Sequence, residues 1–164
     1  MHTNGKMMFK KYALPELRKG ESVLEVGPAR GNTIIKDAVV SCGCGYVYAD
    51  VQNFDIGRAC MIPMDGPYMI QRKDRTFDIV LSAQVLEHVA DPFRWVKELA
   101  RVAERAVILI APFSYPVHGD ADYWRVTSLG MRQLMNTAGL KVKLSVCESL
   151  DGNHTDAIGI GVKP

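Results

Sequence analysis

A turn between a strand and a helix, near the start of the chain, constrains the fold more than any other segment. Residues 22–32 (SVLEVGPARGN) read as an apolar strand carrying a carboxylate, a turn with two glycines, and the beginning of a helix. Because glycine lacks a Cβ and tolerates tight turns, such a backbone can approach a nucleotide-like ligand closely. The dinucleotide fingerprint Gly-x-Gly-x-x-Gly does not fit, since its slots hold Gly27, Ala29 and Asn32. The pattern Glu-x-Gly-x-(Gly/Ala)-x-Gly fits instead, on Glu25, Gly27, Ala29 and Gly31.

Apolar runs alternate with helical patterns along the rest of the chain. We expect strands at 22–26, 46–50, 60–63, 77–82, 107–111, 140–146 and 157–162, and helices at 32–40, 92–103 and 128–137. Asp91 is the predicted N-cap of the helix at 92–103, and Pro112 is expected to end the fifth strand. The buried face of that helix is expected to carry Phe93, Val96, Leu99 and Val102. Strands that alternate with helices predict βαβ units and a mostly parallel sheet, whose ligands bind at the carboxyl ends of the strands.

The totals are those of an ordinary soluble globular protein. The 164 residues suit a single domain, 48% of them are hydrophobic and 23% are charged. A formal net charge of +2 gives no strong signal for nucleic acid. We expect no signal peptide, because residues 1–11 are polar and basic, and no membrane span. The four cysteines do not form a dense framework, so free thiols in a cytoplasmic compartment are expected.

A second block, residues 75–93 (RTFDIVLSAQVLEHVADPF), identifies a family when it is combined with the first. It is similar to the FDxVxxxxxLEHVxDP block of the class I S-adenosylmethionine-dependent methyltransferases, and the turn at 25–31 resembles their first motif. The resemblance runs from about residue 21 to 112. It implies a Rossmann-like three-layer α/β/α sandwich, with a seven-stranded, mostly parallel sheet and one antiparallel strand near the end. It also implies methyl transfer from S-adenosylmethionine, with S-adenosylhomocysteine as product.

Candidate cofactor residues follow the predicted strands. Asp50 ends the second strand a little over twenty residues after Gly27, where nucleotide-binding βαβ units place a carboxylate on the ribose hydroxyls. The alternative is an acidic turn residue. The resemblance implies that Asp65 meets the adenine amine, although Asp65-Gly66 also reads as a turn pair, and Met64 could pack on the purine or fill the core. The full predicted set is Glu25, Gly27, Pro28, Ala29, Gly31, Asp50, Val51, Met64, Asp65, Ser82, Ala83 and Gln84.

Residues 113–127 (FSYPVHGDADYWRVT) form an aromatic and polar segment after the fifth strand, which predicts a surface loop. Its Tyr-Trp-Arg-Val-Thr run resembles a Tyr-Trp-Arg-(Phe/Val)-Thr segment found in a subset of the same family. This resemblance implies an acceptor site lined by Tyr115, His118, Tyr123 and Arg125. Arg125 could hold a carboxylate or phosphate of the acceptor, or it could pair with a nearby carboxylate of the protein. Trp124 is expected to anchor the loop.

Two histidines are the candidate catalytic residues. His88 is expected beside the methyl position, and an unperturbed imidazole titrates near pH 6.5. The alternative is a histidine that orients the loop. If the acceptor must lose a proton, His88 or His118 is the predicted base. His118, Asp120 and Asp122 could ligate a divalent metal, but no fourth ligand can be identified, so we predict no metal site.

The expected acceptor is a small molecule, bound by a monomer or a homodimer. A rival reading is a catalytically inactive module that binds the cofactor or a partner, because a fold alone does not imply a function. A nicotinamide-dependent oxidoreductase is disfavoured by the glycine spacing.

Overall fold

A computed structural model describes residues 1–28, 33–52 and 59–164. One seven-stranded sheet has the order β3-β2-β1-β4-β5-β7-β6. Strand β7 is antiparallel to both of its neighbours, and the other strand pairs are parallel. The strands are β1 Ser22–Val26, β2 Gly45–Asp50, β3 Cys60–Pro63, β4 Phe77–Ala83, β5 Ala103–Ser114, β6 Lys141–Glu148 and β7 Thr155–Val162. This arrangement confirms the predicted Rossmann-like sheet with one antiparallel strand.

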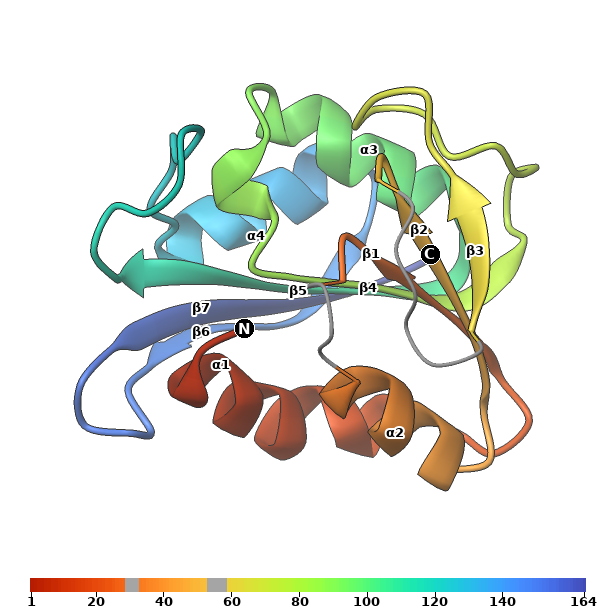
Figure 1. The fold of residues 1–164 in the computed structure, drawn as a ribbon, viewed down its shortest axis with the longest axis horizontal. Helices are drawn as coiled ribbons and strands as arrows, with labels where there is room; N and C mark the ends of the chain where they lie inside the picture. Colours follow the sequence, from red (N-terminus) through yellow and green to blue (C-terminus); the bar gives the residue numbers. More distant parts are fainter. Residues whose placement is uncertain (29–32, 53–58) are drawn as a thin grey trace.

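Helices cover both faces of the sheet and complete three layers (Figure 1). On one face lie α1 (Thr3–Met8) with its continuations η1 (Phe9–Ala13) and η2 (Leu14–Glu16), together with α2 (Ile34–Ser41). On the other face lie α3 (Pro92–Val102) and α4 (Ser128–Thr137). A short 3-10 turn, η3 (Leu86–His88), joins β4 to α3.

Two hydrophobic cores follow from the alternation of side chains along the central strands. Val23 and Ile79 pack under α1 and α2, whereas Leu24 and Val80 pack under α3 and α4. All four side chains are fully buried. Strands that are covered on both faces read as continuous apolar runs, which is why the sequence located them.

Helix α3 begins as predicted. Asp91 caps it by accepting a hydrogen bond from the backbone N–H of Arg94 at 2.9 Å, and Pro92 occupies the first turn. The predicted buried face is partly wrong, because Phe93 is 45% exposed and Trp95 is buried in its place.

Strand β5 and the N-terminal segment differ most from the prediction. Strand β5 begins at Ala103, earlier than the predicted residue 107. Strand β5 passes through Pro112 to Ser114, because the missing N–H of Pro112 falls beside an irregularity in the pairing with β7. Residues 3–16 are helical and bury Met8, Phe9 and Ala13, whereas the sequence showed residues 1–11 only as a polar and basic stretch. Among the described residues, no helix is long and apolar enough to cross a lipid bilayer.

Candidate active site

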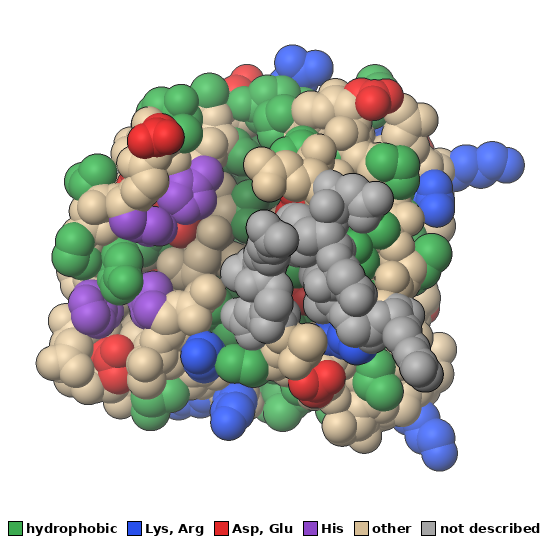
Figure 2. All heavy atoms as spheres, in the orientation of Figure 1, with side chains coloured by type: hydrophobic (Ala, Val, Ile, Leu, Met, Phe, Trp, Pro, Cys, Tyr) green, Lys and Arg blue, Asp and Glu red, His purple; other side chains and the backbone are tan. Residues whose placement is uncertain are grey.

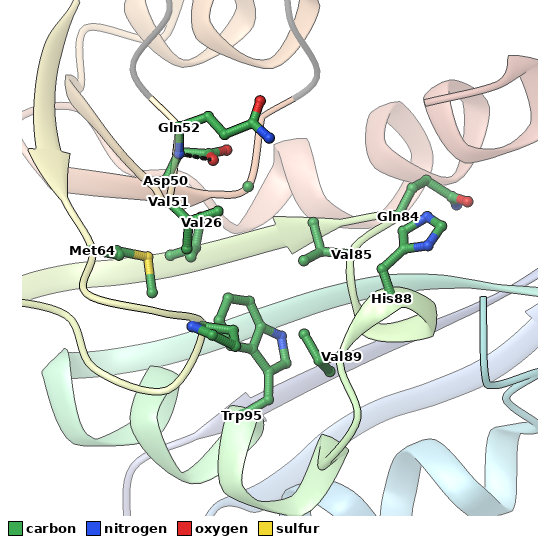
Figure 3. Close-up of a pocket in the computed structure, with 12 residues that line it drawn as sticks. Val26, Asp50, Val51, Gln52, Met64, Gln84, Val85, His88, Val89 and Trp95 are labelled. Carbon is green, nitrogen blue, oxygen red and sulfur yellow. Dashed lines mark hydrogen bonds between the residues drawn. The ribbon is translucent and has the colours of Figure 1, made fainter. Parts of the chain in front are cut away.

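A cavity of about 490 Å³ opens at the carboxyl ends of β1, β2 and β4 (Figure 3). Its position is the topological switch point of the sheet, because β2 and β4 pair with β1 on opposite sides. The volume is typical of a site for a small molecule or a cofactor. The lining residues are Val26, Gly27, Asp50, Val51, Gln52, Met64, Pro67, Gln84, Val85, His88, Val89 and Trp95.

Asp50 places a carboxylate on one side of the cavity (Figure 3). Its Oδ1 accepts from the backbone N–H of Gln52 at 2.9 Å, which orients the group at the end of β2. Partial burial raises the pKa of Asp50 above its ordinary value. A carboxylate held in this way can accept from both hydroxyls of a cis-diol.

Gly27 forms the adjacent wall, where β1 ends. Its φ is +73°, and a Cβ at this position would lie 2.5 Å from Cγ2 of Val85. The backbone N–H of Gly27 donates to the carbonyl of Ala49 at 2.9 Å, which holds the turn against β2. Only glycine therefore fits between this turn and Val85 without displacement.

The opposite side of the cavity comes from the end of β4 and from η3. Gln84 has a φ of +59°, and its side chain turns away to donate to Oδ1 of the buried Asp156 at 2.9 Å. Nδ1 of His88 contacts the carbonyl of Ala121. Because a carbonyl only accepts, this contact places the proton of a neutral imidazole on Nδ1 and leaves a lone pair on Nε2.

Apolar side chains lie between these two sides, among them Val85, Val89 and Trp95, whereas Met64 lies on the side of Asp50 (Figure 3). The buried indole N–H of Trp95 has no hydrogen-bond partner within residues 1–28, 33–52 and 59–164. A ligand in the cavity could satisfy this donor.

The structure divides the predicted cofactor residues into two groups. Gly27, Asp50, Val51, Met64 and Gln84 line the cavity. Glu25, Pro28, Asp65, Ser82 and Ala83 are not among its lining residues. Ala29 and Gly31 lie outside the described residues.

Residues of the second group are engaged elsewhere. Glu25 is buried and accepts from the hydroxyl of Tyr46 at 2.5 Å, and desolvation raises its pKa to about 7. The hydroxyl of Ser82 donates to the carbonyl of Val26 at 2.9 Å and so ties β4 to β1. The exposed carboxylate of Asp65 accepts from the side chain of Gln71 at 2.6 Å.

The loop between β5 and α4, residues 115–127, lies beside η3. The backbone N–H of Tyr123 donates to the carbonyl of Glu87 at 2.7 Å. The side chain of Tyr123 is exposed. The indole N–H of Trp124 donates to the carbonyl of Val89 at 2.8 Å, so Trp124 anchors the loop as expected.

Arg125 and Asp122 form an ion pair within this loop and hold its conformation. Nη2 of Arg125 donates to Oδ2 of Asp122 at 2.8 Å, Nη1 contacts Oδ1, and Nε donates to the carbonyl of Tyr115 at 3.0 Å. The guanidinium holds the pKa of Asp122 well below its ordinary value. This is the second of the two readings that the sequence left open for Arg125.

Three aromatic side chains gather at the same edge of the site. The rings of His88 and His118 lie 4.9 Å apart in an edge-to-face arrangement, and the ring of Tyr115 is 5.2 Å from His118. Tyr115 also stacks on His2, with 4.4 Å between the ring centroids. Figure 2 shows histidine side chains gathered on the left of the face in view. The stacking of His2 therefore brings the N-terminal segment to this edge of the site.

Comparison with known proteins identifies the family. The family model described as a methyltransferase domain matches residues 7–143. The chain belongs to this methyltransferase family. Its cofactor is S-adenosylmethionine, as predicted, and its reaction is methyl transfer.

Solved structures agree with this fold. A chain of the Haloferax volcanii complex between the Trm112 methyltransferase activator and a candidate methyltransferase is 17% identical, with a TM-score of 0.77 over 98% of this chain and 93% of that one. An S-adenosylmethionine-dependent methyltransferase from Aquifex aeolicus is also 17% identical, with a TM-score of 0.70 over 98% and 90%. Haemonchus contortus phosphoethanolamine N-methyltransferase 2, in complex with phosphomonomethylethanolamine and S-adenosylhomocysteine, is 12% identical, with a TM-score of 0.71 over 98% and 52%.

The cavity of this methyltransferase fits such a cofactor. A nucleoside needs acceptors for its ribose hydroxyls, and the carboxylate of Asp50 provides two oxygens. The N–H of Trp95, which has no partner among the described residues, offers a donor to a ligand, and the missing Cβ of Gly27 leaves space for one.

Proposed function

We propose that this methyltransferase acts on a small-molecule acceptor, which reaches the transferred methyl group from the side of His88 and the β5–α4 loop. The observation that carries the proposal is the two-sided cavity, with the carboxylate of Asp50 on one wall and the imidazole of His88 on the other. A net charge of +2 gives little attraction for a polyanionic acceptor. The four free cysteines are compatible with the predicted cytoplasmic location.

In this proposal the first wall holds the adenosyl group. Asp50 accepts from the ribose hydroxyls, and Met64 and Trp95 provide apolar surface next to it. The close approach at Gly27 admits the ligand to the turn after β1. Val51 and Gln84, which were also predicted, line the same cavity and would border the bound cofactor.

The bound cofactor supplies a methyl group on a positively charged sulfur, which is displaced in line. The protein then has to hold the two reacting atoms close together and aligned. A nitrogen or oxygen acceptor must also lose a proton. The free Nε2 of His88 lies where it could receive that proton, and His118 is adjacent to it. Tyr115 and Tyr123 would border the acceptor, while Arg125 positions the loop through Asp122.

Replacing Asp50 tests the cofactor side. Asp50→Ala should weaken the binding of S-adenosylhomocysteine by about 1–3 kcal/mol, because it removes charge-assisted hydrogen bonds to the ribose. Isothermal titration calorimetry measures this affinity directly. Asp74→Ala is the matched control, because Asp74 is an exposed carboxylate that pairs with Arg101 away from the cavity. Equal affinities for the wild type and Asp50→Ala would refute the ribose role.

A screen of acceptors tests the other side. The protein is incubated with S-adenosylmethionine and pools of small molecules, and methylated products are detected by mass spectrometry. Tight binding of S-adenosylhomocysteine without a product from any small-molecule pool, but with a product from protein or RNA, would overturn the acceptor class and leave methyl transfer intact.

A further inference from the structure

One carboxylate and two imidazoles meet at the edge of the cavity. Ligand atoms of Glu87, His88 and His118 all lie within 4.8 Å of one another, and Nε2 of His88 is 3.8 Å from Oε1 of Glu87. Glu87 has no exposed surface, and neither of its carboxylate oxygens has a hydrogen-bond partner in the part of the chain that the structure describes. A carboxylate buried in this way is costly unless a proton or a cation neutralises it.

Both imidazoles are oriented by contacts through their other ring nitrogen. Nδ1 of His88 contacts the carbonyl of Ala121. Nδ1 of His118 lies 3.1 Å from Oδ2 of Asp122 and 3.2 Å from the carbonyl of Pro116. Metal-ligating histidines usually make a contact of this kind, to a carbonyl or a carboxylate, which fixes the tautomer and directs the free nitrogen. In both histidines, Nε2 is therefore the ring nitrogen that can bind a metal ion.

The β5–α4 loop holds the three groups in register. Asp122, which orients His118, is itself held by the guanidinium of Arg125, with Nη2 and Oδ2 2.8 Å apart. The N–H of Tyr123 fastens the loop to the carbonyl of Glu87 at 2.7 Å. The carboxylate from η3 and the imidazole from the loop are therefore brought together by several independent contacts.

We propose that Glu87, His88 and His118 form a binding site for a divalent transition-metal ion. Two imidazoles and one carboxylate suit zinc, iron(II) or manganese(II), and three protein ligands leave coordination positions open. Because metal–ligand bonds of about 2.0–2.2 Å bring ligands to within about 3–3.5 Å of one another, the three side chains would draw together on binding.

This site differs from the one that the sequence considered and set aside. That combination was His118 with Asp120 and Asp122, all from one loop. Asp120 is exposed, and Asp122 is committed to Arg125. The carboxylate that meets His118 comes instead from Glu87, about thirty residues earlier in the chain.

A role for the cation follows if the proposed function holds. His88 lines the cofactor cavity, so a bound ion would lie at the wall where the acceptor enters. With Nε2 of His88 bound to the ion, that nitrogen cannot also serve as the base. An acceptor hydroxyl that binds the ion becomes more acidic and releases its proton to water instead. Its oxygen lone pair would then form the new O–CH3 bond, while the C–S bond breaks with its electrons on sulfur. Binding of the ion itself does not depend on this role.

Titration of the untagged protein tests the site. After treatment with a chelator, the protein is titrated with Co²⁺ and followed by visible absorption, and with Zn²⁺ by calorimetry, in the absence of S-adenosylmethionine. The wild type should bind one equivalent of either ion. Glu87→Gln and His118→Asn should each weaken binding at least about 100-fold, since each removes a ligand.

Two variants serve as matched controls. Asp120→Asn removes an exposed carboxylate of the same loop, and His154→Asn removes a histidine that is not in the cluster. Both should bind the ions as the wild type does. Glu87→Gln is isosteric and removes a buried charge, so it should stay folded, which circular dichroism verifies.

The possible results separate the two proposals. Metal binding that is absent in the wild type, or unchanged in Glu87→Gln and His118→Asn, overturns the metal site. In that case Glu87 is neutralised by a proton. Calorimetry with S-adenosylhomocysteine on the same samples is independent. Lost cofactor binding alongside intact metal binding would refute the cofactor site alone.

Discussion

Gly27 closes β1 with a φ of +73° and forms part of the cavity wall beside Val85. An added methyl group at this position meets two separate obstacles. The left-handed conformation disfavours any side chain, by about 1–2 kcal/mol. The contact of 2.5 Å with Cγ2 of Val85 would force a shift of that side chain or of the turn.

Gly27→Ala should therefore lower the free energy of unfolding by about 2–4 kcal/mol. It should also weaken the binding of S-adenosylhomocysteine, because the turn would move into the cavity. Urea denaturation and calorimetry measure the two effects. The double variant Gly27→Ala/Val85→Ala relieves the overlap and should recover part of the lost stability.

Gly152→Ala provides the control for backbone strain. Gly152 has a φ of +74°, and an added Cβ would have no neighbour within 4 Å. Its variant should lose about 1–2 kcal/mol and keep the cofactor affinity. If Gly27→Ala lost no more stability than Gly152→Ala, the close approach at Val85 would not matter.

Residues at the ends of strands could be found from the sequence, the apolar Val51 and Met64 included, whereas the apolar wall residues beyond β4 could not. Asp50 and His88 were predicted because their spacing and motif have a chemical meaning. Val85, Val89 and Trp95 also line the cavity, but an apolar residue at a helical or strand position reads as core. The pairing of Glu87 with His118 depends on how the β5–α4 loop folds, and periodicity contains no information on that.

The N-terminal helix α1 is attached to β6 and β7 through the buried side chain of Asn4. Asp156 of β7 accepts from Nδ2 of Asn4 at 2.7 Å and from Nε2 of Gln84 at 2.9 Å. Asn4 also donates to the carbonyl of Glu148 at 2.9 Å and accepts from the N–H of Leu150 at 2.6 Å. Asn4 and Asp156 are fully buried, so these bonds have no competition from water.

Asp156→Ala should destabilise the protein by about 2–4 kcal/mol, because it leaves buried donors of Asn4 and Gln84 unpaired. The loss should concentrate in α1, whose amide hydrogens should exchange faster than those of α3. Hydrogen exchange followed by mass spectrometry resolves the two helices. Lys11→Ala is the control, since Lys11 forms an exposed ion pair with Glu148 and should affect α1 little. Uniform loss of protection over both helices would contradict a local attachment.

Strands and helices could be predicted where a single physical cause explains the sequence pattern. The central strands are apolar because both faces are covered, and α3 begins at a capping aspartate followed by proline. Helix α1 and its continuation η1 were missed because their buried apolar side chains, Met8, Phe9 and Ala13, are few and are interspersed with lysines. The end of β5 was misplaced because proline tolerates a strand position next to a pairing irregularity.

At the scale of the whole molecule, two buried glutamates make stability depend on pH. Desolvation raises the pKa of Glu25 and of Glu87 to about 7, from an ordinary value of 4.5. The native state therefore binds protons more tightly than the unfolded state in this window. The stabilising effect is complete below the unfolded pKa and is lost as the pH rises through 7.

The free energy of unfolding should fall between about pH 5 and pH 8, by a few kcal/mol in total. Glu87→Gln should flatten part of this slope, and Glu25→Gln should flatten another part. Urea denaturation across the pH range, with a chelator present, measures the effect. Glu104→Gln, which changes an exposed glutamate paired with Arg75, should keep the wild-type profile. A wild-type stability that rises with pH in this range would contradict both assignments.

The fold class followed from two sequence blocks in register, and the sheet order agrees with it. What remained open was how distant loops meet over the strand ends. Those contacts depend on side-chain geometry in irregular segments. Neither the two-residue repeat of strands nor the repeat of about 3.6 residues in helices applies there.

The ion pair between Asp122 and Arg125 affects how an acceptor is recognised. The carboxylate of Asp122 already serves the guanidinium and the N–H of His118, both at 2.8 Å. A loop whose polar groups are already paired is ordered before an acceptor binds. Binding then costs little conformational entropy. Recognition should then resemble lock and key more than induced fit, and selectivity would reside in the shape of a rigid rim.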